Sequence, residues 1–357
     1  GAASNVGAAY VVFGGPGVGA SGLLNLSTLD GSNGFTILGG EDGDSAGWSV
    51  AGAGDINNDS HADILVGAPF TAPLGRGLAG ESYIVFGGPS VGASGVVPLA
   101  TLTPADGFRI PGVTAGDHSG RSVAGAGDIN GDGIDDALIG APRAGTASRA
   151  AAGITYAVFG SPTIGASGSF DLAALNGANG FAILGALTGR NAGHAVSAAG
   201  DVNGDTHADI IIGTLQWNSA YLVFGGPGAG ASGLVDLVSL DGTNGCEIVG
   251  ITLGDHAGQA VAGAGDFNGD DLDDLAIGAP FARMNFGDAF IVRGRLATPA
   301  CAGDINNDGF TNAADFVILA GNFGASVTPN TSGDLNGDGL VNAADFTILA
   351  GDFGCGN

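Results

Sequence analysis

Residues 123–142 read VAGAGDINGDGIDDALIGAP, two short runs of small and β-branched residues joined by an acidic turn. The first run, with its aspartate, recurs as VAGAGD at 50–55 and 261–266 and as VSAAGD at 196–201. The second recurs as DILVGAP at 63–69, DIIIGTL at 209–215 and DLAIGAP at 274–280. Short apolar runs bounded by glycine and aspartate are typical of β-strands, so the stretch predicts two strands joined by a tight turn, four times over.

Two further blocks complete each repeat. The first reads YVVFGG (10–15), YIVFGG (83–88), YAVFGS (156–161) and YLVFGG (221–226), with AFIVRG (289–294) as a divergent fifth copy. The second reads GFTILGG (34–40), GFRIPG (107–112), GFAILG (180–185) and GCEIVG (245–250). Four strands in each of several tandem repeats are typical of β-propeller blades, so we expect a mainly β fold.

Composition agrees with this expectation and excludes several functions. The chain of 357 residues contains 71 glycines, which suits many tight turns. It has 35 acids against nine bases, all of them arginine, and a net charge of −26. Such a charge repels nucleic acid, and the lack of lysine excludes Schiff-base and P-loop chemistry. No 18-residue apolar run predicts a transmembrane helix. No signal peptide is visible, and the abrupt start suggests a mature or trimmed form.

The blocks VAGAGDxNxDxxxDxxxGAP resemble the FG-GAP repeats of the integrin α-subunit propeller and of many bacterial surface proteins. The resemblance predicts a propeller of four-stranded blades over residues 1–297. Two departures stand out: Ala46, Ser119, Ala192 and Ala257 occupy the position of the family's phenylalanine, and GAP becomes Gly213-Thr214-Leu215 in the third repeat.

The repeats alone do not determine the number of blades. The repeats begin in mid-blade with YVVFGG and end after AFIVRG, which leaves two strands at the start and three at the end. This is one strand more than a single closing blade needs, and related propellers usually have seven blades. We therefore expect either upstream blades outside this sequence or an irregular closure.

Each acidic turn has the pattern Asp-x-Asn-x-Asp-x-x-x-Asp. The four sets are Asp55/Asn57/Asp59/Asp63, Asp128/Asn130/Asp132/Asp136, Asp201/Asn203/Asp205/Asp209 and Asp266/Asn268/Asp270/Asp274. Short oxygen-bearing side chains at alternate positions of a tight turn can converge on one ion, and calcium prefers six to eight oxygen ligands. The alternative is an Asx-turn that satisfies its own backbone without a metal. Four copies in a strongly acidic chain favour calcium.

The resemblance to integrin loops assigns the ligands. It implies side-chain oxygens from positions 1, 3, 5 and 9 and a backbone carbonyl from position 7. Position 7 is His61, Ile134, His207 and Leu272 in turn, so these side chains are not expected to bind the ion. The calcium would be structural. Since every acidic cluster is assigned to a metal loop and no catalytic grouping stands out, we predict a propeller with no catalytic residues.

The last 57 residues contain two 12-residue loops. The first places Asp304, Asn306, Asp308, Phe310, Asn312 and Asp315 at positions 1, 3, 5, 7, 9 and 12; the second places Asp334, Asn336, Asp338, Leu340, Asn342 and Asp345 there. In each loop, position 7 would offer its backbone carbonyl and glycine at position 6 allows the sharp turn. AADFVILAGNFG and AADFTILAGDFG then supply helical apolar spacing. Two loop–helix units resemble a dockerin type I domain, predicted over residues 298–357.

Cys301 and Cys355 bracket this small segment, and a disulfide between them would suit an oxidising compartment. In dockerins, loop positions 10 and 11 contact a cohesin; here they are Ala313/Ala314 and Ala343/Ala344, small residues that suit an apolar partner. Duplication of the unit would permit two docking orientations. The alternative is a calcium-clamped cap that packs on the propeller.

Three functions follow from these features. The first is an extracellular or cell-surface, calcium-stabilised, non-catalytic protein that binds or scaffolds in adhesion, with a dockerin-like tail for a cohesin-like partner or surface polysaccharide. The second is a homopolymer assembled by strand exchange between copies. The third is a polysaccharide-active enzyme recruited by the tail. Large, varied residues at Trp48, Arg121, His194 and Gln259 and at Phe70, Arg143, Trp217 and Phe281 predict either a ligand face or solvated loop tips.

Overall fold

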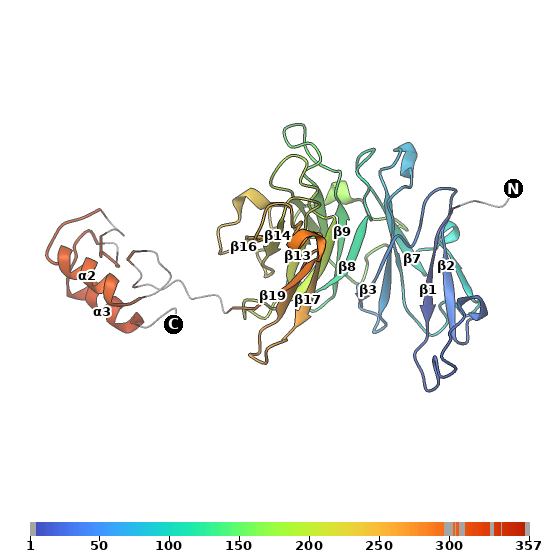
Figure 1. The fold of residues 1–357 in the computed structure, drawn as a ribbon, viewed down its shortest axis with the longest axis horizontal. Coiled ribbons are helices and arrows are strands. Elements are labelled where there is room, and N and C mark those ends of the chain that lie inside the picture. Colours follow the sequence, from blue (N-terminus) through green and yellow to red (C-terminus); the bar gives the residue numbers. More distant parts are fainter. Residues whose placement is uncertain are drawn as a thin grey trace. The chain divides into compact units, whose positions relative to one another are not determined.

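A computed structural model describes residues 5–295, 303, 305–306, 311–328, 332–336 and 338–353. The chain divides into two compact units, residues 1–295 and 296–357. The regular elements of the first are mainly β-strands, and the second contains the two longer helices (Figure 1). The mainly β fold with a small helical segment at its end, predicted from the repeats, is therefore confirmed.

The first unit contains three complete four-stranded blades. Their strands are β3 (Ser49–Gly54), β4 (Asp63–Ala68), β5 (Glu81–Val85) and β7 (Gly107–Pro111); β8 (Ser122–Gly127), β9 (Asp136–Ala141), β10 (Ile154–Val158) and β11 (Gly180–Leu184); and β12 (Ala195–Gly200), β13 (Asp209–Gly213), β14 (Ser219–Val223) and β16 (Gly245–Val249). Neighbouring strands within each blade are antiparallel. Each of the four sequence blocks forms one strand.

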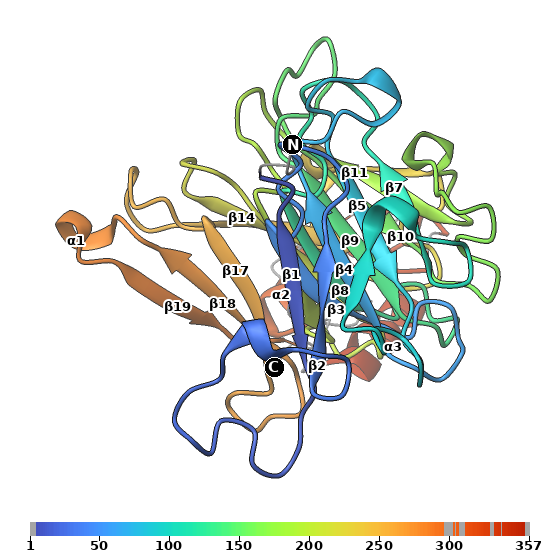
Figure 2. The same cartoon turned by 90° about the vertical axis from the view of Figure 1, so that its right-hand side faces the viewer.

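A partial sheet lies on either side of these blades. One contains β1 (Ala8–Val12) and β2 (Gly34–Leu38), and the other contains β17 (Ala260–Gly265), β18 (Asp274–Ala279) and β19 (Asp288–Val292). This matches the count of two strands and three strands made from the blocks. Within the described residues β1 and β19 are both edge strands. The sheets follow one another from the blue strands β1 and β2 to the orange strands β17 and β19 (Figures 1 and 2).

Short elements connect the strands. β6 (Val96–Pro98) pairs in parallel with β2, and β15 (Leu234–Asp236) pairs in parallel with β11, so a loop of one blade extends the sheet before it. Single-turn helices lie at Leu26–Thr28, Pro73–Gly75, Leu99–Thr101, Leu172–Ala174 and Leu237–Ser239, and α1 spans Ala282–Asn285.

The blades pack closely because the sequence places glycine where the backbones meet. The innermost strands β3, β8, β12 and β17 lie next to one another in that order. A Cβ on Gly140 of β9 would lie 2.1 Å from the carbonyl oxygen of Gly193, which precedes the next blade. Ser122 Oγ donates a hydrogen bond to the same carbonyl at 2.8 Å. Buried aromatic and β-branched residues, among them Phe108 and Ile139, fill the space between sheets.

The second unit is built from two near-identical helices, α2 (Ala313–Asn322) and α3 (Ala343–Asp352). Each begins with a capping box, in which the Asn312 or Asn342 side chain accepts a backbone N–H and the Asp315 or Asp345 carboxylate returns the contact. Leu319, Val341 and Leu349 form its small buried core. Such a core stabilises a domain only weakly by itself.

Candidate metal-binding loops

The four acidic turns of the first unit all lie between the innermost strand of a blade and the strand that follows it. They join β3 to β4, β8 to β9, β12 to β13 and β17 to β18. The pairing register shifts by one residue just before each turn, between Gly125 and Gly127 in β8 for example. Gly127 has a φ of 68°, a conformation that glycine adopts without strain. This bulge directs the chain into the turn at the predicted first ligand, Asp128.

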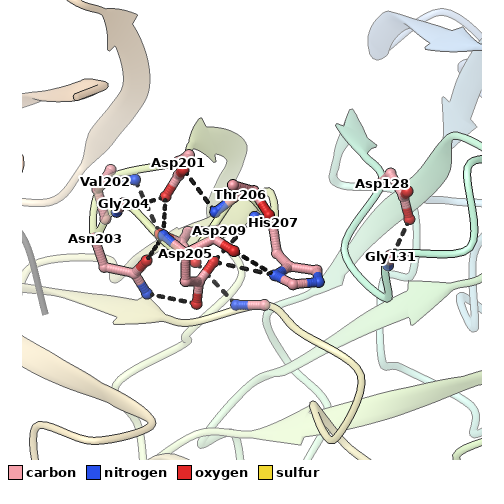
Figure 3. Close-up of polar contacts among 11 residues, drawn as sticks. Asp128, Gly131, Asp201, Val202, Asn203, Gly204, Asp205, Thr206, His207 and Asp209 are labelled. Atoms are coloured by element: carbon pink, nitrogen blue, oxygen red, sulfur yellow. Dashed lines mark hydrogen bonds and ion pairs between the residues drawn. The ribbon is translucent and has the colours of Figure 1, made fainter. Parts of the chain in front are cut away.

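In each turn, carboxylate oxygens accept hydrogen bonds from backbone N–H groups of the same turn. In the second turn Asp128 Oδ1 accepts the backbone N–H groups of Gly131 and Asp132 at 2.7 and 3.1 Å, and Oδ2 accepts that of Gly133 at 2.8 Å. Asp132 Oδ1 accepts the N–H of Ile134 at 2.9 Å. Positions 1 and 5 of the predicted ligand set are thus brought together in one turn. The contacts from positions 5, 6 and 7 recur in the first turn around Asp55 and Asp59. They also recur in the third turn around Asp201 and Asp205 (Figure 3).

The asparagines predicted as ligands at position 3 contact the acid at position 5 in three of the turns. In the second turn Asn130 Nδ2 donates to Asp132 Oδ2 at 3.1 Å, and Asn130 Oδ1 accepts the backbone N–H of Asp132 at 2.8 Å. An amide oxygen has two lone pairs, so one remains for an ion. The donating amide nitrogen, however, occupies one oxygen of a carboxylate that was predicted to bind the ion. The same two contacts join Asn57 to Asp59 and Asn203 to Asp205.

The fourth turn departs from this pattern. Asn268 Nδ2 lies 3.4 Å from both carboxylate oxygens of Asp274, so the asparagine contacts position 9 here. Asp270 keeps its role, because its N–H donates to Asp266 Oδ1 at 3.0 Å and its Oδ1 accepts the N–H of Leu272 at 3.1 Å. The hydrogen bonds of Asn268 therefore differ from those of its three counterparts, and its assignment as a ligand stays a prediction. In all four turns the acid at position 1 accepts the N–H groups of positions 5 and 6, and the acid at position 5 accepts that of position 7.

The ninth-position aspartates Asp63, Asp136, Asp209 and Asp274 are buried. Asp136 Oδ2 accepts the N–H of Ile129 in its own turn, and Oδ1 accepts that of Gly160, which follows β10, both at 2.9 Å. Burial, together with repulsion from Asp132 and Asp128, raises the pKa of Asp136 to about 7 although these two hydrogen bonds oppose the shift. The same causes raise the pKa of Asp209 to about 7 and that of Asp63 to about 6.

The chemistry of these groups fits a hard cation. A buried carboxylate with a raised pKa lacks positive charge nearby, and oxygen ligands alone favour calcium over zinc. Among the described residues, however, no three acid, histidine or cysteine side chains are grouped as a metal centre, because the turn carboxylates point toward backbone N–H groups and asparagine amides. This geometry is compatible both with a calcium loop and with an Asx-turn that holds no metal. The ligand assignments therefore stay predictions.

The histidines at position 7 face their own turns. His61 Nδ1 lies 3.1 Å from Asp59 Oδ1, and His207 Nδ1 lies 3.2 Å from Asp205 Oδ1. His207 also reaches the neighbouring turn, since a Cβ on Gly131 would meet its Nε2 at 2.7 Å (Figure 3). The backbone N–H of Ala208 donates to the carbonyl of Asp128 at 3.1 Å. Neighbouring acidic turns are therefore in direct contact.

The loops of the second unit follow the same scheme. Asp334 accepts the N–H groups of Asp338 and Gly339 at 3.2 and 2.8 Å, and Asp338 accepts that of Leu340 at 2.8 Å. Asp345 Oδ1 accepts the N–H groups of Leu335 and Asn336, at 2.8 and 3.1 Å, so the acid of the helix is tied to the start of its loop.

The first loop of this unit is only partly described. Asp315 accepts the N–H groups of Ile305 and Asn306 at 2.8 and 3.2 Å, as Asp345 does in the second loop. Asp304, Asp308 and Phe310 lie outside the described residues, and so do Cys301 and Cys355 with their expected disulfide.

Four of the eight large side chains predicted as a ligand face or as loop tips, Trp48, Phe70, Arg121 and Trp217, lie in two clusters. Trp48 packs edge-on against Phe70 with ring centroids 5.0 Å apart, and the Arg121 guanidinium lies 4.5 Å from the Trp48 ring. Arg190 lies 5.7 Å from the Trp217 ring. Trp48 and Trp217 are each 47% exposed, so both rings remain accessible.

Sequence reasoning missed one group of acids. Glu41, Asp44 and Glu81 line a cavity with Tyr83 and Arg109, away from every acidic turn. The expectation that the metal loops account for every acidic cluster is therefore wrong. Glu41 and Asp44 lie in the loop before β3 and Glu81 at the start of β5, so no short sequence pattern joins them. The sequence offers single-residue differences as a signal: Glu81 stands where other blades have Ile154 and Ser219.

Comparison with known proteins identifies both parts of the chain. The FG-GAP repeat model matches residues 46–85, 119–158 and 257–292, and the dockerin type I domain model matches residues 302–353. The chain therefore carries FG-GAP repeats followed by a dockerin type I domain, as the sequence predicted. The third repeat, in which GAP is replaced by Gly213-Thr214-Leu215, is absent from the matched segments.

Individual relatives match parts of the chain. Human phosphatidylinositol-glycan-specific phospholipase D is 31% identical over 169 residues, 47% of this chain and 18% of that protein. Drosophila melanogaster integrin alpha-PS2 is 28% identical over 228 residues, 61% of this chain and 15% of that protein. The chain thus spans less than a fifth of these relatives.

Among solved structures, a type II cohesin-dockerin domain from Bacteroides cellolosolvens is 45% identical, with a TM-score of 0.14, over 16% of this chain and 88% of that one. FG-GAP repeats form binding modules, dockerins dock cohesins, and both generally bind calcium; such modules are typical of extracellular proteins. No helix among the described residues has both the length and the apolar character to span a membrane.

Proposed function

We propose that this protein is an extracellular, calcium-stabilised binding or scaffolding protein without catalytic residues, and that its dockerin domain anchors the propeller to a cohesin. The observation that carries the proposal is the presence, in one chain, of FG-GAP repeats and a dockerin type I domain. We assign residues 1–297 to the propeller and residues 298–357 to the docking domain.

Six calcium ions, four in the propeller and two in the dockerin, would complete the structure. The four buried ninth-position aspartates support the propeller sites, since calcium would neutralise carboxylates whose hydrogen bonds come from neutral groups. In the dockerin, Asp315 and Asp345 accept hydrogen bonds from the start of their loops, and each would also bind a calcium ion.

Exposed apolar residues on the dockerin helices support a protein partner. Ala313, Ala314, Ala343 and Ala344, predicted to contact a cohesin, are all exposed. Phe316 and Phe346 are 43% and 44% exposed, and their ring centroids lie 6.1 Å apart. Residues 313–321 and 343–351 have the same pattern of burial, which would let either helix present the same surface.

Calorimetric titration of the full chain with a panel of cohesins tests this proposal. We expect binding with calcium present and its loss after chelation. Ala313→Arg and Ala343→Arg alone should each leave one docking orientation intact and weaken binding less than about tenfold, whereas the double variant should abolish it. Ala173→Arg, on an exposed turn of the propeller, is the control. Wild-type binding by the double variant would contradict the docking role.

Each of the two alternative functions has its own experimental test. A homopolymer formed by strand exchange would show concentration-dependent assembly in analytical ultracentrifugation, with calcium present and no cohesin. A polysaccharide-active enzyme would release reducing ends from cell-surface polysaccharides. Simple binding to those polysaccharides would instead support the scaffolding function.

A further inference from the structure

The strongest unassigned feature of the molecule is the cavity that sequence reasoning missed. It has a volume of about 250 Å³ and lies between the loop that precedes β3, the loop that follows β4 and the start of β5. Three carboxylates, those of Glu41, Asp44 and Glu81, line it together with the Tyr83 hydroxyl and one guanidinium, that of Arg109. The lining is thus strongly polar and carries an excess of negative charge.

Glu81 is the buried centre of this cavity. It is only 4% exposed, and its Oε2 accepts a hydrogen bond from the Tyr83 hydroxyl at 2.5 Å. Its other oxygen, Oε1, is buried and has no hydrogen-bond partner among the described residues. A buried carboxylate oxygen without a donor is costly, so a donor supplied by a ligand would be strongly favoured.

In the third blade, an arginine side chain contacts the residues that correspond to the lining of this cavity. In β14 and β16, Ser219, Tyr221 and Glu247 occupy the positions of Glu81, Tyr83 and Arg109, because Tyr83 pairs with Arg109 as Tyr221 pairs with Glu247. There Arg190 Nη1 donates to Glu247 Oε1, Tyr221 OH and Ser219 Oγ at 2.7, 3.1 and 3.3 Å.

The first blade has no such arginine. In the loop before the innermost strand, Asp44 occupies the position of Arg190, as the aligned segments GDSAGWS (43–49) and GRNAGHA (189–195) show. Asp44 is 5% exposed and its Oδ2 accepts the N–H of Glu41 at 2.8 Å. The guanidinium of the third blade is thus replaced in the first blade by the buried carboxylate of Asp44. This carboxylate adds to that of Glu81, whose Oε1 has no partner among the described residues.

We propose that this cavity binds a small alkylguanidinium ligand, whose planar cation takes the place that Arg190 fills in the third blade. The guanidinium would donate to Glu81 Oε1 and to Asp44, which matches its fork of N–H groups to two carboxylates. Arg109 is exposed and forms no ion pair within the described part of the chain, so its charge offsets that of Glu81 only in part. The proposal requires neither a cohesin nor an ion in the acidic turns.

Calorimetric titration of the full chain in saturating calcium chloride tests the proposal, with n-butylguanidinium as the probe and n-butylurea as its neutral isostere. We expect the guanidinium to bind and the urea to bind at least tenfold more weakly. Glu81→Gln should weaken guanidinium binding at least tenfold. Asp117→Asn, at the position of Asp44 in the next repeat, should leave it unchanged.

A filling variant makes the test sharper. Asp44→Arg reproduces the third blade, so it should abolish guanidinium binding and raise the Tm. Thermal unfolding of every variant shows that the chain is folded before its binding is judged. Undetectable binding to the wild-type chain, or equal binding of the probe by the Glu81→Gln variant, or equal binding of n-butylurea, would each overturn the proposal.

Discussion

Asp136 joins three parts of its blade through one carboxylate. It holds the start of its own turn through Ile129 and the end of the next strand through Gly160, while it stays buried beside Asp128 and Asp132. A neutral amide could keep only one of these two acceptor contacts. The requirement for aspartate is therefore geometric as well as electrostatic, and it recurs at Asp63 and Asp209.

Glu81 allows a prediction about pH. Burial raises the pKa of Glu81 above its ordinary value, and Asp44 and Glu41 reinforce the shift, while Tyr83 and Arg109 oppose it. A carboxyl with a raised folded-state pKa stabilises the fold when protonated, and that contribution is lost as the pH rises through this pKa. Glu81→Gln cannot ionise, so it should raise the Tm more at pH 8 than at pH 5.

Thermal scans in saturating calcium and without guanidinium check this difference. About 1 kcal/mol would correspond to roughly 2–4 °C in a chain of this kind. Asp106→Asn, at an exposed carboxyl, should show the same Tm change at both pH values. An equal effect of Glu81→Gln at pH 5 and pH 8 would mean that Glu81 does not ionise in the folded protein.

The second strand of each blade carries a glycine near its end, and in most blades the next blade packs directly against it. A Cβ on Gly67, Gly140 or Gly213 would lie 2.1 Å from a backbone carbonyl of the next blade. The equivalent Gly278 has no following blade among the described residues, and a Cβ there would meet only Ala260, at 3.3 Å or more. One residue of the repeat thus has different surroundings in different copies.

This difference predicts opposite outcomes for the same substitution. Gly140→Ala should lower the free energy of unfolding by about 1–3 kcal/mol, because the strand must move away from the Gly193 carbonyl. Gly278→Ala should change it by less than about 0.5 kcal/mol, as is usual where no packing is disturbed. Urea denaturation measures both values. Equal losses would show that the glycine serves strand geometry rather than blade contact.

The sequence predicted the elements far better than their contacts. Repetition of the blocks VAGAGD and DALIGAP located the inner strands and turns, since each block has the same role in every copy. It could not locate the cavity, because Glu81 and Asp44 come from different blocks and meet only after the sheets pack. Nor could it show that Asn268 contacts a different acid from its counterparts, because the pattern of the turn is the same in all four copies. Cys246 is half-buried and packs against the core of the last two sheets.

The whole chain combines two units whose stability should depend on the same ion. Each unit holds acidic turns with matching hydrogen-bond patterns, around Asp128 in the propeller and Asp334 in the dockerin. Yet each unit has its own core, and Leu319, Val341 and Leu349 belong only to the second. We therefore expect two unfolding transitions, both shifted by calcium.

Calorimetry with loop variants separates the two units. Chelation should lower both transitions, since a ligand present at 100 times its Kd adds about 2.7 kcal/mol to stability. Asp128→Asn with Asp132→Asn should lower only the propeller transition, and Asp334→Asn with Asp338→Asn only the dockerin transition. Melting that is unchanged by chelator would refute the calcium sites and favour plain Asx-turns.

The glycine-to-carbonyl contact between blades also bears on how such a chain evolves. Gly140 meets Gly193 in the same way that Gly67 meets Gly120 and Gly213 meets Gly258. Because each blade offers its neighbour the same surface, a duplicated gene segment could be inserted between two blades without redesign of either interface. The cavity residues Asp44 and Glu81, by contrast, correspond to Arg190 and Ser219 in the third blade, so these positions of the repeat are free to diverge after duplication. The glycine contacts between blades must therefore stay constant, whereas the cavity residues can vary under selection.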